Sequence, residues 1–167
     1  QNTGRPIMRV TGVKPQYYPF VMPPEIKSKS LEEKYLDPES IVRRYRYYCE
    51  THEFLGESFP NLNADFGPGS VAAYLGSDIT FRDDTVWFES CVKDWESFPE
   101  LKFNPENKWF KKHLGLFDQC KKLIGDDFPI AIPDLMENVD VLASLRGAMD
   151  LIYDMIEDED EVIKRVQ

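Results

Sequence analysis

Polar side chains follow three segments with strand-like composition, where a carboxylate could act as a general base or stabilise a developing positive charge. These side chains are Asn63, Asp65, Glu89, Asp134 and Glu137. We expect Asp65 and Asp134 to be catalytic, and Asn63 and Glu137 to contact substrate. The alternative is that Asp65 and Asp134 cap helices or stabilise turns, as aspartates commonly do.

Cysteines and histidines recur twice at helical spacing. Cys49 and His52 are three residues apart, and His113 and Cys120 are seven apart. Each pair could offer two metal ligands, and the four together could form one site. The competing interpretation is core packing, since free cysteines are usually buried and Cys120 lies within an apolar stripe.

A basic cluster alternates with tyrosines in one predicted helix. It contains Arg43, Arg44 and Arg46. Such a cluster could bind an anion such as phosphate. Alternatively, the arginines extend their aliphatic stems over a neighbouring surface.

Short runs rich in β-branched and aromatic residues indicate the strands that position these groups. The predicted strands are 6–10, 61–66, 85–88 and 128–132. The last is almost wholly apolar, which is typical of a parallel sheet covered on both faces.

Capping patterns and apolar periodicity indicate the helices. The predicted helices are 37–54, 71–75, 104–124, 142–156 and 162–166. Leu142, Leu145, Met149, Ile152 and Ile156 have the spacing of a buried stripe.

Two parts of the chain differ in organisation. Residues 1–36 contain five prolines of the twelve in the chain, which predicts an irregular amino-terminal arm. Strands alternate with helices over 37–167, which predicts an α/β fold of βα units with a parallel sheet.

The charge of the chain limits its partners. The net charge is −10 over 167 residues, with a net +4 over 1–48 and −14 over 49–167. A negative chain is unsuited to nucleic acid or to an anionic membrane surface. A small-molecule substrate is the expected ligand.

The three cysteines are widely spaced, which suits a reducing compartment better than a disulfide framework. No apolar run approaches the roughly 18–20 residues needed to cross a bilayer. We therefore expect a cytoplasmic protein.

Several segments together resemble the uroporphyrinogen decarboxylase-like superfamily. They are Asn63–Gly69 with Tyr74–Gly76, Trp87–Glu89 with Asp94–Trp95, Asp126–Ile132, Val141–Gly147 and the acidic helix start at Glu157–Val166. The resemblance covers roughly residues 37–167. It implies the amino-terminal portion of a (β/α)8 TIM barrel, because an autonomous barrel needs about 250 residues. This chain alone is then expected to be inactive.

The resemblance implies either decarboxylation or methyl transfer linked to a corrinoid or a thiol. Arg9 matches one of the two arginines that bind substrate carboxylates in the decarboxylases, and the second is missing, which favours methyl transfer. Arg146 is a further expected substrate contact. The zinc ligands of the methyltransferases lie in the second half of those proteins, so this chain itself is expected to hold no cofactor.

Two hypotheses therefore stand. The first is a fragment of a methyltransferase or carboxy-lyase whose full-length form uses zinc and a corrinoid. Its partners would be its own carboxy-terminal half, a corrinoid protein or a homodimer partner. The second is a non-catalytic acidic α/β module that binds a protein or a small ligand.

Overall fold

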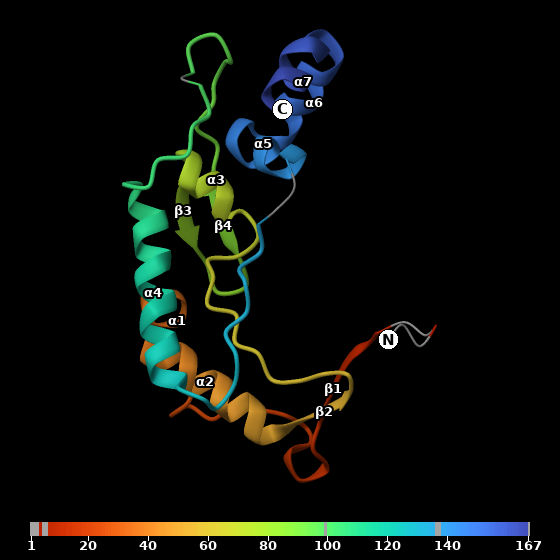
Figure 1. The fold of residues 1–167 in the computed structure, drawn as a ribbon, viewed down its shortest axis with the longest axis vertical. Helices are drawn as coiled ribbons and strands as arrows, with labels where there is room; N and C mark the ends of the chain where they lie inside the picture. Colours follow the sequence, from red (N-terminus) through yellow and green to blue (C-terminus); the bar gives the residue numbers. More distant parts are fainter. Residues whose placement is uncertain (1–3, 5–6, 99, 136–137, 167) are drawn as a thin grey trace. The chain divides into compact units, whose positions relative to one another are not determined.

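The computed structural model describes residues 4, 7–98, 100–135 and 138–166, and Figure 1 shows the order of its elements. The fold is mixed α/β. The chain divides into two compact units. Unit 1 comprises 1–64 and 118–131, and unit 2 comprises 65–117 and 132–167.

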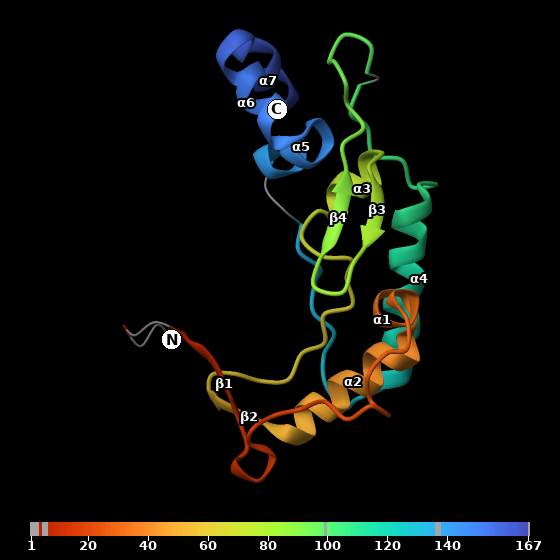
Figure 2. The ribbon, with the colours of Figure 1, turned by 180° about the vertical axis from the view of Figure 1, so that it is seen from behind.

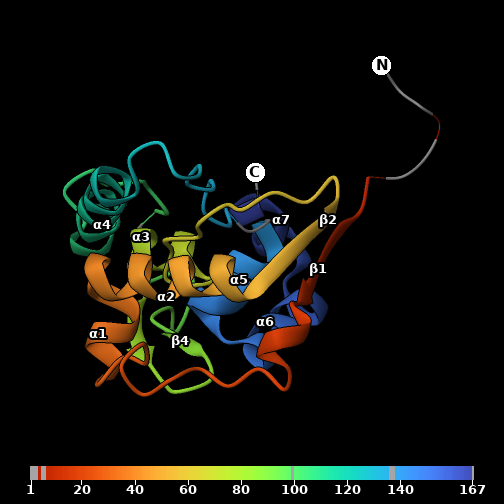
Figure 3. The ribbon, with the colours of Figure 1, turned by 90° about the horizontal axis from the view of Figure 1, so that it is seen from below.

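Unit 1 contains a two-stranded antiparallel sheet. Strand β1 (Arg9–Val13) pairs with β2 (His52–Gly56), with Thr11 opposite Phe54. The two strands lie side by side in Figure 3. The predicted strand at 6–10 therefore lies a few residues too early, and the predicted helix at 37–54 is too long because its last residues pair with β1.

Two consecutive helices precede β2. Helix α1 (Leu31–Leu36) begins at Ser30, whose side chain accepts a hydrogen bond from the Glu33 amide at 3.1 Å. Helix α2 (Pro38–Thr51) begins at Asp37, as predicted. The arm is thus more ordered than predicted, since it holds β1, a 3-10 turn (Pro15–Tyr17) and α1.

The segments 61–66 and 128–132 form one bridge instead of two strands. Leu62 pairs in parallel with Ile130, and neither segment is otherwise part of a strand. Pro129 and Pro133 have no amide hydrogen to donate, which limits how far a ladder can extend.

Unit 2 contains a β-hairpin. Helix α3 (Ser70–Leu75) is followed by β3 (Asp78–Phe81) and β4 (Val86–Glu89), which pair antiparallel. Figure 2 shows the hairpin beside α3. The helix predicted at 71–75 and the strand predicted at 85–88 are both confirmed to within one residue.

Helix α4 (Lys108–Ile124) is the longest, and the boundary between the units falls within it. Asn107 caps it, because its Oδ1 accepts hydrogen bonds from the Trp109 and Phe110 amides at 2.8 and 3.1 Å. The helix thus starts four residues after the predicted position. Gly125, with φ 55°, ends it as expected.

The carboxy-terminal part consists of α5 (Asn138–Arg146), α6 (Ala148–Glu157) and α7 (Glu159–Val166). The single helix predicted at 142–156 is wrong, because Gly147 has φ 96° and turns the chain between α5 and α6.

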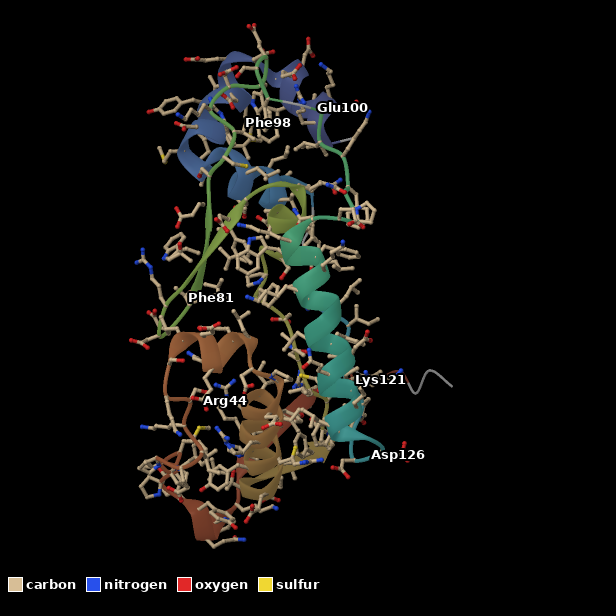
Figure 4. All side chains as sticks on the ribbon, turned by 90° about the vertical axis from the view of Figure 1, so that its left-hand side faces the viewer. Arg44, Phe81, Phe98, Glu100, Lys121 and Asp126 are labelled. Carbon is tan, nitrogen blue, oxygen red and sulfur yellow. The ribbon has the colours of Figure 1, made fainter. Side chains whose placement is uncertain are left out.

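One hydrophobic cluster of unit 2 includes residues from all three helices. Leu142, Leu145, Leu151 and Val162 pack with Trp95, and Phe98 lies beside them in Figure 4. The predicted buried stripe is correct only for its α5 residues. Its α6 residues, Met149, Ile152 and Ile156, are exposed.

The described residues thus form two two-stranded antiparallel sheets and one parallel bridge, not the expected parallel sheet. None of the helices described is long and apolar enough to cross a membrane.

Candidate functional site

The parallel bridge is where the structure brings two predicted strand segments together. The Leu62 amide donates to the Pro129 carbonyl at 3.0 Å, and the Ala131 amide donates to the Leu62 carbonyl at 2.7 Å. Because the paired segments run in the same direction, the residues that follow each of them leave the bridge at the same end. Asn63, a predicted substrate contact, directly follows Leu62.

The residues after Leu62 alternate in exposure as a strand would. Ala64 and Phe66 are buried and Asn63 is exposed. The Asp65 Oδ1 accepts a hydrogen bond from the Gly67 amide at 2.9 Å, which stabilises a turn where Gly67 has φ 93°. This hydrogen bond fits the turn-stabilising alternative for Asp65, and its catalytic role stays a prediction.

The polar residues that follow the other predicted strands are exposed or lie outside the described residues. Asp134 is exposed, and Glu137 lies outside the described residues. Glu89, at the end of β4, is exposed, and its carbonyl accepts a hydrogen bond from the Ser77 hydroxyl at 2.8 Å. Catalytic or substrate roles for these side chains stay predictions.

The two predicted substrate arginines have contrasting surroundings. Arg9 is exposed on β1, opposite Gly56. The Arg146 guanidinium is largely buried and binds Asp154. A substrate carboxylate could reach Arg146 only by displacing Asp154, so Arg9 is the more accessible of the two.

The histidines are engaged with neighbours in their own units. The His52 Nδ1 lies 2.9 Å from the Thr51 hydroxyl, and its ring stacks on Tyr48 with a centroid distance of 3.9 Å. The buried His113 shares a hydrogen bond between its Nδ1 and the Tyr74 hydroxyl. Both pairings support the packing interpretation of these residues.

The cysteines also fit a packing role. Cys120 is fully buried, and burial raises its pKa to about 11, which disfavours a thiolate ligand. Burial also raises the pKa of Cys49. Within the described ranges, no group of three or more His, Cys, Asp or Glu side chains could hold a metal ion.

Unit 1 has a cleft beside α2 with a volume of about 440 Å³. Its lining combines apolar and charged side chains: Ile26, Glu39, Val42, Arg43, Arg46, Tyr47, Glu50 and Leu123. Two arginines of the predicted basic cluster are therefore part of a concave surface.

Both cleft arginines already have carboxylate partners. Arg43 Nη2 lies 3.0 Å from Glu33 Oε1, and Arg46 Nη2 lies 2.6 Å from Asp127 Oδ2. These pairs neutralise the two arginines, and the cleft lining also carries the carboxylates of Glu39 and Glu50. Its chemistry suits an apolar ligand with a positive group better than an anion.

The third arginine of the cluster, Arg44, is directed into unit 1. Its guanidinium donates to the Ser28 hydroxyl and the Lys34 carbonyl, and Figure 4 shows it near α1. Burial lowers the pKa of Arg44. The arginine-rich pattern indicated this part of the chain. The carboxylates that neutralise the two cleft arginines lie outside that pattern, at Glu33 in α1 and at Asp127 after α4.

No protein-family model, curated protein or solved structure matches this chain in the comparisons with known proteins.

Proposed function

We propose that the chain supplies amino-terminal βα units of a uroporphyrinogen decarboxylase-like TIM-barrel enzyme. The reaction is methyl transfer linked to a corrinoid or a thiol, or a related decarboxylation. The observation that supports this proposal is the parallel bridge between Leu62 and Ile130.

Parallel pairing requires a crossover, which is usually helical. Helix α4 (Lys108–Ile124) lies between the two paired residues in sequence, as the helix of a βα unit would. Beyond the bridge, Ile132 and Leu135 are 83% and 59% exposed. Further strands of a barrel would cover such apolar side chains.

In this proposal, Asp65 and Asp134, which follow the two bridged residues in sequence, are the catalytic carboxylates. The substrate contacts are Arg9, Asn63, Glu137 and Arg146. The described residues do not fit a zinc site. Ligands for zinc and the contacts to a corrinoid would therefore come from other parts of the full-length protein or from a partner.

The test is an activity assay of the protein encoded by the complete reading frame. Methyl transfer from methylcobalamin to a thiol and release of carbon dioxide from a carboxylated tetrapyrrole are measured separately. We expect Asp65→Asn and Asp134→Asn each to lower kcat by roughly a hundredfold. Asp118→Asn, at an exposed site on α4, is the matched control and keeps full activity. Absence of both activities in the complete protein contradicts the proposal.

The cleft beside α2 favours a second candidate, a binding module. The carboxylates of Glu39 and Glu50 lie with Tyr47 beside apolar side chains. We expect phenethylamine to bind more tightly than phenylacetate. Both compounds carry a phenyl group, but phenethylamine is positively charged and phenylacetate is negatively charged. Calorimetric titration measures both, and Glu39→Gln with Glu50→Gln should abolish the preference. Equal binding of the two compounds contradicts this candidate.

A further inference from the structure

Helix α6 carries an apolar stripe on its exposed side. At about 100° per residue, its four members fall within about 100° of the helix circumference. They are Met149, Ile152, Tyr153 and Ile156, which are 62%, 49%, 56% and 76% exposed. This spacing of i, i+3, i+4 and i+7 is that of one helix face.

The opposite side of α6 attaches the helix to unit 2. Leu151 is 2% exposed and lies within the core, and Asp154 is held by Arg146. By the same helical geometry, Leu151 lies roughly opposite the centre of the stripe. The helix therefore has two apolar sides, of which one is already packed.

Acidic side chains border the stripe. Asp150 and Glu157 lie along one edge of it, by the helical geometry. From Ala148 to Ile163 the chain has seven Asp or Glu residues and no Lys or Arg. Asp154 is paired with Arg146 and Glu161 with Arg165. The other five acids are exposed: Asp150, Glu157, Asp158, Glu159 and Asp160.

We propose that this face of α6, the stripe with its acidic border, is a docking surface for a basic amphipathic helix of a protein partner. In a complex of this type, the apolar faces of two helices pack against each other. Lys and Arg side chains of the partner complement the acidic border. The flexible side chain of Met149 adapts to the shape of the helix that docks.

Charge distinguishes this partner from two other occupants. A second copy of the chain would bring one acidic border against another, which is repulsive. An anionic lipid surface would be repelled in the same way. A cationic helix gains from both the apolar and the charged parts of the surface.

The test uses a fluorescein-labelled synthetic peptide of about 18 residues, enough for five helical turns. Leu and Trp occupy one face of its helix and Lys the other, and a peptide of the same composition in scrambled order is the reference. Fluorescence anisotropy measures binding at low and at physiological salt. We expect the amphipathic peptide to bind more tightly than the scrambled one, and less tightly as salt increases.

Variants locate the binding site. Ile152→Ser with Ile156→Ser should weaken binding by roughly tenfold or more, because two buried apolar contacts are lost. Ile156→Ser alone is the milder variant, since this side chain is 76% exposed and its loss should not affect folding. The matched control is Ile7→Ser with Val21→Ser, which alters side chains 85% and 71% exposed far away in sequence.

Four outcomes overturn the proposal. Equal binding of the scrambled peptide indicates attraction by charge alone, and unchanged binding by the α6 variants places the site elsewhere. Self-association or vesicle binding that the α6 substitutions abolish, without peptide binding, identifies a second copy or a membrane as the occupant. Finally, binding by this chain but not by the protein from the complete reading frame shows that the face is covered within the protein itself.

Discussion

Arg146 and Asp154 form a bidentate ion pair that connects α5 to α6. Arg146 Nε lies 2.7 Å from Asp154 Oδ2, and Nη2 lies 3.0 Å from Oδ1. The Trp95 indole also donates to Oδ2 at 2.7 Å. Because Gly147 turns the chain between the two helices, this pair fixes which side of α6 faces the core.

Arg146→Met should therefore destabilise the protein. The substitution keeps the aliphatic stem but leaves Asp154 partly buried without its cation. We expect a loss of about 1–2 kcal/mol in the free energy of unfolding, measured by urea denaturation. Arg82→Met, which alters an arginine in the β3–β4 turn, is the control. A loss no larger than that of the control would contradict the structural role of the pair.

The same pair predicts a dependence of stability on pH. Hydrogen bonds from Arg146, with a further one from Trp95, hold the pKa of Asp154 below its usual range. A depressed folded-state pKa contributes stability above the unfolded value of about 3.9, and that contribution is lost as pH falls through the folded value. The stability difference between the native protein and Asp154→Asn should thus shrink below about pH 4. A constant difference would contradict the assignment.

Tyr74→Phe should destabilise unit 2, because the substitution removes a buried hydrogen bond. The Tyr74 hydroxyl is hydrogen bonded to His113 Nδ1, and both residues are buried. Removal of the hydroxyl leaves that nitrogen without this partner. We expect the free energy of unfolding, measured by urea denaturation, to fall by about 1–2 kcal/mol. Tyr153→Phe, at an exposed site on α6, should have no effect.

Burial raises the pKa of Tyr74 to about 12. A raised folded-state pKa contributes stability that is present below the unfolded value of about 10 and lost as pH rises from there through the folded value. The stability difference between the native protein and Tyr74→Phe should consequently change between about pH 10 and 12. Titration of Tyr74 at its unfolded value would contradict this prediction.

Thiol labelling should distinguish the buried cysteine from the two that are partly exposed. Cys120 is fully buried, whereas Cys49 and Cys91 are partly exposed. The pKa of all three is raised by burial, to about 11 for Cys120. Mass spectrometry after brief iodoacetamide treatment should find Cys49 and Cys91 modified slowly and Cys120 only after unfolding. Rapid labelling of Cys120 would contradict its burial.

The sequence predicts most elements that local signals define. Asp37 at the start of α2 and Gly125 at the end of α4 are recognisable from residue type alone. Ser30 and Glu33 form a similar helix-start signal for α1. The proline-rich composition of the arm led instead to a prediction of irregular structure.

Long-range pairing explains what the sequence did not predict. His52 continues the apolar periodicity of α2, yet pairing of β2 with β1 ends that helix at Thr51. Glu33 and Asp127 neutralise the cleft arginines, although the basic cluster alone suggested an anion site. Strand β1 and Asp127 are distant in sequence from their partners, and Glu33 lies in the helix that precedes Arg43.

Two glycine substitutions should have opposite effects on stability. A Cβ on Gly69 would overlap the ring of Phe88, whereas nothing lies within 4 Å of one on Gly115 in α4. Neither glycine has a positive φ, so the space around the new methyl group decides the outcome. We expect Gly69→Ala to cost about 1–3 kcal/mol through overpacking, and Gly115→Ala to gain about 0.5–1 kcal/mol through helix propensity.

Urea denaturation measures both variants, and a second substitution tests the cause. Phe88→Leu removes the aromatic ring that the new methyl group meets, so Gly69→Ala should cost less in that background than in the native one. If the cost of Gly69→Ala is unchanged by Phe88→Leu, the contact between α3 and β4 is not its origin. A destabilising effect of Gly115→Ala would likewise show that this part of α4 is packed more closely than the structure indicates.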